Sequence, residues 1–143
     1  MSRRRSPLAP LLGAIALLAS CAPPPRAPMP DAEEYVFPAA SPGQLSPAEA
    51  GRIEKAWRQI LAGDAAGAQR DLAKMLGRSP GLIPAETALG YAWLRAGRFE
   101  EAARRFENVA ARQPDYVPAL AGAAATASRR GEVEGALRLY RRA

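Results

Sequence analysis

Residues 89–106 read LGYAWLRAGRFEEAARRF, and the fold follows from this stretch. Apolar residues recur every three or four positions on both sides of Gly97, which is typical of two amphipathic helices. The stripes comprise Leu89, Ala92, Trp93 and Ala96 before the glycine, and Phe99, Ala102, Ala103, Phe106, Val109 and Ala110 after it. Because glycine permits a tight turn, the stretch predicts a helical hairpin with Trp93 and Phe106 in its core.

The hairpin pattern repeats with a period of 34 residues. Five sets of positions keep this step: Gly63, Gly97 and Gly131; Ala68, Ala102 and Ala136; Leu72, Phe106 and Tyr140; Pro80 and Pro114; and Pro84 and Pro118. Several independent positions at one period indicate a repeat protein, in which each hairpin packs on its neighbours. Ser46-Pro47-Ala48-Glu49 has the pattern of a capping box with proline at the first helical position, so the first helix is expected to begin there.

The middle repeat resembles the tetratricopeptide repeat (TPR), a 34-residue unit of two helices. It reads Leu89-Gly90-x-x-Trp93, followed by Gly97, Ala102-x-x-x-Phe106 and Pro114. The resemblance covers about residues 48–143 and implies an all-α fold, a short TPR-type helical-hairpin solenoid. Its units are expected at about 49–82, 83–116 and 117–143, the last one incomplete.

The last unit ends at Ala143, within its expected second helix, and no polar capping helix follows. Terminal repeats normally need such a cap for solubility. Three interpretations stay open: the sequence is a fragment, the open end packs on a partner or on itself, or the domain is marginally stable. We favour a fragment or a self-associating end.

In TPR proteins the first helices of successive repeats line a concave groove that binds peptides or protein segments. Carried onto this chain, the resemblance implies groove positions at Ile53, Trp57, Ile60, Leu61, Thr87, Tyr91, Leu94, Arg95, Ala121, Ala125, Ser128 and Arg129. An aromatic residue at helical spacing is usually a core residue, so two interpretations of Trp57 stay open, core or accessible groove.

Arginine residues gather on the last two expected helices. Beside Arg129, this basic face comprises Arg130, Arg138, Arg141 and Arg142. Such a face is usually only solvated, but it also suits an acidic polymer or anionic lipid headgroups. No platform of aromatic and basic residues indicates nucleic acid, which is not expected as a partner.

The N-terminus has the parts of an export signal. Residues 1–5 carry three arginines, residues 7–20 are mostly apolar, and Leu18-Ala19-Ser20-Cys21 resembles the bacterial lipobox. This resemblance implies a lipoprotein signal peptide over residues 1–20 and a lipid anchor on Cys21. Because Ala22 rather than aspartate follows, it also implies transfer to the outer membrane, facing the periplasm, in a Gram-negative host. The alternative is a chance cysteine in an ordinary signal peptide.

Residues 21–47 contain the expected lipidated cysteine and a proline-rich linker. Such a composition disfavours helix and predicts a disordered, extended spacer. Tyr35-Val36-Phe37 interrupts it, and two interpretations stay open. The three residues are part of a disordered tether, or they form a short docking segment that packs on the domain. A further hypothesis is that the segment occupies the groove in the resting protein and that a partner displaces it.

Composition excludes several classes of function. The chain has no histidine and one cysteine, which rules out Ser-His and Cys-His catalytic pairs, an internal disulfide and a Cys/His zinc site. Catalysis by carboxylates alone stays open on composition, but the expectation is no enzyme, no metal and no cofactor. The leading interpretation is a lipid-anchored TPR adaptor or scaffold that mediates protein–protein interactions at the bacterial cell envelope. The alternative is an envelope lipoprotein whose basic face binds an acidic polymer or lipid during secretion or assembly.

Overall fold

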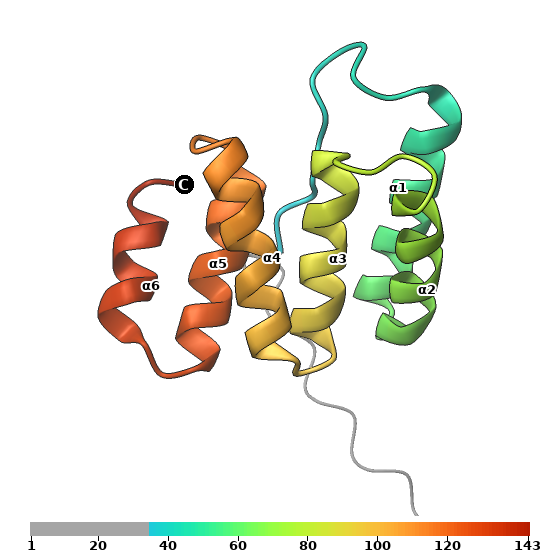
Figure 1. Cartoon of the computed structure of the whole chain (residues 1–143). Coiled ribbons are helices and arrows are strands. Elements are labelled where there is room, and N and C mark those ends of the chain that lie inside the picture. The colour runs from blue at the N-terminus through green and yellow to red at the C-terminus, as the bar shows by residue number, and fades with distance from the viewer. Residues whose placement is uncertain (1–34) are drawn as a thin grey trace, which may run out of the picture.

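The computed structural model describes residues 35–143, which contain six helices and no strand. The helices are α1 (Pro47–Leu61), α2 (Ala65–Leu76), α3 (Ile83–Arg95), α4 (Phe99–Arg112), α5 (Val117–Arg129) and α6 (Val133–Tyr140). Figure 1 shows them as a row of hairpins that runs from α1 to α6. The predicted all-α helical-hairpin solenoid is confirmed. The predicted signal peptide, Cys21 and the linker up to residue 34 lie outside the described residues.

The helices form an inner and an outer row. Each helix packs on the next one, and the first helices of the hairpins also contact one another, α1 with α3 and α3 with α5. Within residues 35–143, no such contact joins α2 to α4 or α4 to α6. The faces of α1, α3 and α5 are therefore the ones that lie together across the repeats.

The 34-residue period corresponds to a glycine turn that repeats between the two helices of each hairpin. Gly63, Gly97 and Gly131 each join the two helices of a hairpin, with φ of 86°, 75° and 78°. Residues with a Cβ rarely adopt these values, so glycine recurs at each turn. The predicted capping box is also confirmed, because Ser46 accepts from the Glu49 amide at 3.3 Å and donates its own amide to Glu49 at 2.9 Å.

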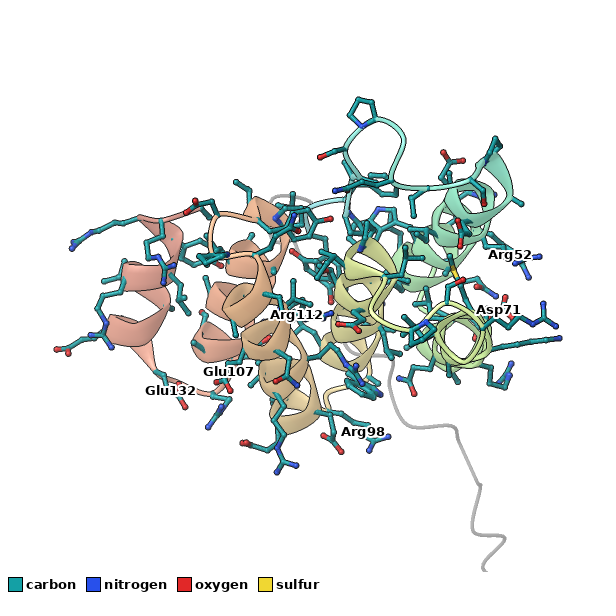
Figure 2. The ribbon with its side chains drawn as sticks, turned by 45° about the horizontal axis from the view of Figure 1, so that its top comes forward. Arg52, Asp71, Arg98, Glu107, Arg112 and Glu132 are labelled. Carbon is teal, nitrogen blue, oxygen red and sulfur yellow. The ribbon has the colours of Figure 1, made fainter. Side chains whose placement is uncertain are left out.

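Phe106 fills the space where three helices meet. Its ring is fully buried on α4 and lies against Gly90 of α3 and Gly122 of α5. A Cβ at Gly90 would lie 2.7 Å from the ring, which is closer than such contacts occur. The same two helices, α3 and α4, are also joined by an ion pair between the buried Glu86 and Arg112, the latter labelled in Figure 2. These contacts fix the hairpin at the middle of the row.

Trp93 lies at the edge of the core, so the prediction that it lies inside the core is wrong. The ring is half-buried, and its outer side is covered by the guanidinium groups of Arg105 and Arg98, at 5.0 and 6.0 Å from the ring centre. Cation–π contacts of this kind let a tryptophan remain partly exposed.

Helix α6, the last one in the structure, carries apolar side chains that are exposed to solvent. Tyr140 stands one period after Phe106, but it is 45% exposed whereas Phe106 is covered by α5. Val133 and Leu137 on the same helix are also exposed. The three interpretations of the chain's end stay predictions.

The contact between Gly90 and Phe106 can be tested with alanine. Gly90→Ala should lower the free energy of unfolding by about 1–3 kcal/mol, because the new methyl group overpacks the site. Gly51→Ala is the matched control, since Gly51 is exposed on α1 and a Cβ there would meet no atom within 4 Å. The control should gain about 0.5–1 kcal/mol from helix propensity. Urea unfolding followed by circular dichroism measures both, and equal stabilities of the two variants would contradict the packing argument.

Candidate functional site

Residues 35–39, here called the docked segment, lie on the inner row of helices. Figure 1 shows this part of the chain in blue-green, leading up to the loop that reaches the start of α1. Phe37 precedes proline, which biases it toward an extended backbone, and Pro38 has no amide hydrogen to offer a helix. The segment is therefore suited to lie across helices without joining them.

Aromatic rings hold the segment in position. The ring centre of Tyr35 lies 6.2 Å from that of Trp57 on α1 and 5.1 Å from that of Tyr91 on α3. Phe37 meets Trp57 edge to face at 5.7 Å. The ring of Tyr91 in turn packs against Trp57 at 5.2 Å and against Phe106 at 5.1 Å. A continuous chain of rings thus connects the docked segment to the core, and each such pair contributes about 0.5–1.5 kcal/mol beyond burial.

Two tyrosine hydroxyls bind the backbone of the segment. The Val36 amide donates to Oη of Tyr91 at 3.3 Å, and Oη of Tyr116 donates to the carbonyl of Ala39 at 2.8 Å. Tyr91 also donates to the carbonyl of Pro118 in α5 at 2.9 Å. Because these bonds go to main-chain atoms, they do not depend on the side chains of Val36 and Ala39.

Burial keeps both hydroxyl groups protonated. Desolvation raises the pKa of Tyr91 and of Tyr116 well above the ordinary value of 10.0. Both groups can therefore donate hydrogen bonds throughout the physiological pH range.

Of the two interpretations of Tyr35-Val36-Phe37, the structure shows the segment that packs on the domain, and its displacement by a partner stays a prediction. Residues 35–46 have no regular secondary structure, as the linker prediction requires, but they pack on the helices. The hydroxyl of Tyr116 was missed, because no sequence pattern distinguishes a tyrosine that reaches a distant carbonyl from one that faces solvent.

Most of the predicted groove positions are buried. Trp57 is 8% exposed and Leu94 is 5% exposed, beside the fully buried Ile53, Ile60, Thr87 and Tyr91. The hydroxyl of Thr87 bonds to the carbonyl of Ile83 in its own helix. Arg95 is half-buried, while Leu61, Ser128 and Arg129 are exposed. Trp57 is thus a core residue on one side and meets the docked segment on the other; the role of these positions in binding a partner stays a prediction.

Part of the positive charge of the predicted basic face is paired with glutamates. Arg130 pairs with Glu132 at 2.9 Å and with Glu100 at 3.3 Å, and Arg142 donates to the carbonyl of Pro114 at 3.3 Å. Arg138 and Arg141 are exposed on or beside α6. Part of this face is therefore committed to contacts within the domain.

A second group of cations was not predicted. It surrounds a shallow hollow of about 220 Å³ between α1 and α2, lined by Arg52, Lys55, Asp71, Lys74, Met75 and Arg78. Figure 2 shows Arg52 and Asp71 on this flank of the molecule. Lys55 pairs with Asp71 at 2.7 Å, which leaves an excess of positive charge around the hollow.

Residues 35–143 contain no group of three potential metal ligands among histidine, cysteine, aspartate and glutamate. In the same part of the chain, none of the helices has the length and apolar character needed to cross a membrane.

The geometry defines a class of protein, a solenoid of helical hairpins whose inner face holds a segment without regular secondary structure. A family model for the tetratricopeptide repeat matches residues 94–143, which comprise α4 to α6 and the end of α3. Tetratricopeptide repeats generally mediate protein–protein interactions, and they are typically without catalytic activity. No curated protein and no solved structure shows significant similarity to the chain.

Removing the indole of Trp57 should release the docked segment. Trp57→Ala loses the ring contacts to Tyr35 and Phe37, worth about 1–3 kcal/mol together. Chymotrypsin cleavage after Tyr35 should then become about tenfold faster or more, because cleavage follows the population of the open form. Trp93→Ala is the matched control, since it removes a tryptophan that does not contact the segment in the aromatic contacts described above. Equal cleavage of wild type and Trp57→Ala, with both folded, would contradict the docking.

With phenylalanine in place of Tyr91, the free energy of unfolding should decrease less steeply as the pH rises above about 10. Because burial raises the pKa of Tyr91 in the folded protein, its contribution is present below about pH 10 and is lost as the pH rises further. For one such group the free energy of unfolding falls by at most about 1.4 kcal/mol per pH unit. Urea unfolding from neutral to alkaline pH should show a shallower decline for Tyr91→Phe. Identical declines in the two proteins would contradict the burial of this hydroxyl.

Proposed function

We propose that this chain is a lipid-anchored adaptor that binds protein partners at the bacterial cell envelope. The observation that carries the adaptor role is the docked segment: α1, α3 and Tyr116, just before α5, hold it through aromatic rings and main-chain hydrogen bonds. A surface of this kind recognises protein segments, which agrees with the general role of tetratricopeptide repeats.

The envelope location is supported by the sequence of the first 21 residues. A basic start, an apolar stretch and Leu18-Ala19-Ser20-Cys21 together favour export, cleavage before Cys21 and acylation of the new N-terminus. One acyl chain would bind a membrane only marginally, whereas two or three give a stable anchor. With Ala22 after the cysteine, the outer membrane facing the periplasm is the proposed destination in a Gram-negative host.

The second candidate function is the binding of an acidic polymer or lipid through basic residues. It is favoured by the exposed Arg138 and Arg141 and by the cations around the hollow between α1 and α2. Such binding would weaken strongly with salt, because exposed charges are screened. The adaptor contact, which depends on aromatic rings, would not.

The proposed anchor predicts the behaviour of a serine variant. The wild type should incorporate a labelled fatty acid and remain with the membrane fraction, because the thiol of Cys21 forms the lipid linkage. Cys21→Ser should incorporate no label and should leave the membrane fraction. Metabolic labelling followed by fractionation measures both properties. A wild type without label, or a labelled Cys21→Ser, would reject the anchor.

The adaptor role is tested by affinity capture from detergent-solubilised membranes of the host. Wild type is compared with the Trp57→Ala, Tyr91→Ala double variant, and Trp93→Ala serves as the control, each first shown to be folded by circular dichroism. A defined protein captured by wild type and Trp93→Ala, but lost by the double variant, is the expected result. Salt-sensitive retention of wild type on an acidic polymer, without any captured protein, would favour the second candidate function.

A further inference from the structure

The docked segment packs on the surface of the core, as a bound ligand would, and is not part of the core itself. Phe37 is 40% exposed, and Tyr35 and Val36 are half-buried, whereas the residues beneath them are almost completely buried. Pro38 alone is fully buried. Two hydrogen bonds, of 3.3 and 2.8 Å, join the segment to the helices through tyrosine hydroxyls. A contact built from a few partly exposed groups can open without unfolding the helices.

We propose that the face formed by Trp57, Tyr91 and Tyr116 is a binding site for an extended protein segment with two aromatic residues two positions apart, followed by proline, and that the docked segment is its internal competitor. This inference rests on the proposed adaptor function and specifies the partner and the regulation of the site.

Tyr35 and Phe37 stand just before a tight turn at Pro38, in which the Ala39 amide donates to the carbonyl of Phe37 at 2.8 Å. In an extended chain residues i and i+2 point to the same side, and Tyr35 and Phe37 both meet the ring of Trp57. The residue between them contributes its amide to Tyr91, so its side chain is not specified. The proline is specified because Pro38 is buried and its missing amide leaves no donor unsatisfied.

A partner can make contacts that the docked segment does not make. Next to Phe37 lies a hollow of about 270 Å³ between the loop and α1. Ala50, Ile53 and Glu54 of α1 form one wall of this hollow, and the segment with its loop forms the rest. When the segment and its loop leave, a longer partner segment gains the wall formed by α1. These added contacts allow it to bind more tightly than the internal sequence.

The short connection makes the docked segment an effective competitor. Residues 40–45 join it to Ser46 at the start of α1, with a turn in which Gln44 donates to the carbonyl of Ser41 at 3.1 Å. A short tether raises the effective concentration of the segment to about the millimolar range. The docked segment therefore excludes partners that bind weakly or are dilute. A partner segment displaces it only if that segment binds more tightly or is locally abundant.

The test uses a fluorescent peptide with the sequence of residues 31–41 and the full-length chain in detergent. Phe37→Ser weakens the competitor, and because Phe37 is 40% exposed the helices should remain folded. Leu137→Ser is the matched control, since it removes an exposed apolar residue of α6. Phe37→Ser should bind the peptide at least about tenfold more tightly than the wild type or the control does. A peptide with serine in place of both aromatic residues should not bind to the wild type or to either variant.

Equal peptide binding by folded Phe37→Ser and wild type would overturn the proposal. A full-length chain cut once within residues 41–45 supplies a second test that does not depend on a substitution in the segment. The labelled peptide should replace the cut N-terminal piece while the helical signal persists. Unfolding on release of that piece would overturn the proposal, because the segment would then be part of the fold. A dimer with exchanged segments in the wild type would overturn the choice of partner, since a second copy would supply the ligand.

These outcomes are separable from those of the adaptor test. Peptide binding without capture of any envelope protein would retain the site and reject the proposed function. If an excess of the peptide does not reduce the capture of an envelope protein, the adaptor function stands and this binding site is rejected.

Discussion

The structure depends on the position of one side chain, Tyr91. Its ring contacts Trp57 of α1 and Phe106 of α4, so it joins the inner row of helices to the outer row. Its hydroxyl is buried and must find partners, because an unsatisfied buried hydroxyl costs about 1–3 kcal/mol. It donates to α5 and accepts from the docked segment. If the segment leaves, the donated bond remains, so the core keeps the more important of the two bonds.

The 34-residue period predicted most of the fold, because it arises from local requirements that each repeat must meet. A glycine with positive φ turns each hairpin, and in the middle repeat Gly90 permits the close approach that Phe106 fills. The capping box at Ser46 located the start of the first helix correctly. Such features involve neighbours in sequence or the same position one repeat away, so they are visible in the sequence itself.

The candidate site was harder to predict, because it depends on how closely the inner helices approach. Alanine residues are common in α3 and α5, and small side chains let helices pack close together. Positions that would line an open groove with bulkier helices, such as Ile60 and Thr87, therefore lie in the core. The apolar residues Tyr35-Val36-Phe37 indicated a docking segment as one interpretation, but its position depends on contacts with α1 and α3 that the linker sequence does not specify. The hydroxyl of Tyr116 was missed for the same reason.

The docked segment lies between the proposed anchor and the domain, so its release would also change how far the domain reaches. Tyr35 stands 14 positions after Cys21, and Ser46 stands 25 positions after it. Release would add the 11 positions from Tyr35 to Ser46 to the connection, which is about 34 Å at about 3.1 Å per residue for an extended chain. A partner that takes the groove would thus free the domain to move farther from the membrane. On the proposed anchoring, one set of aromatic contacts controls both the access of partners to the groove and the distance at which the adaptor works.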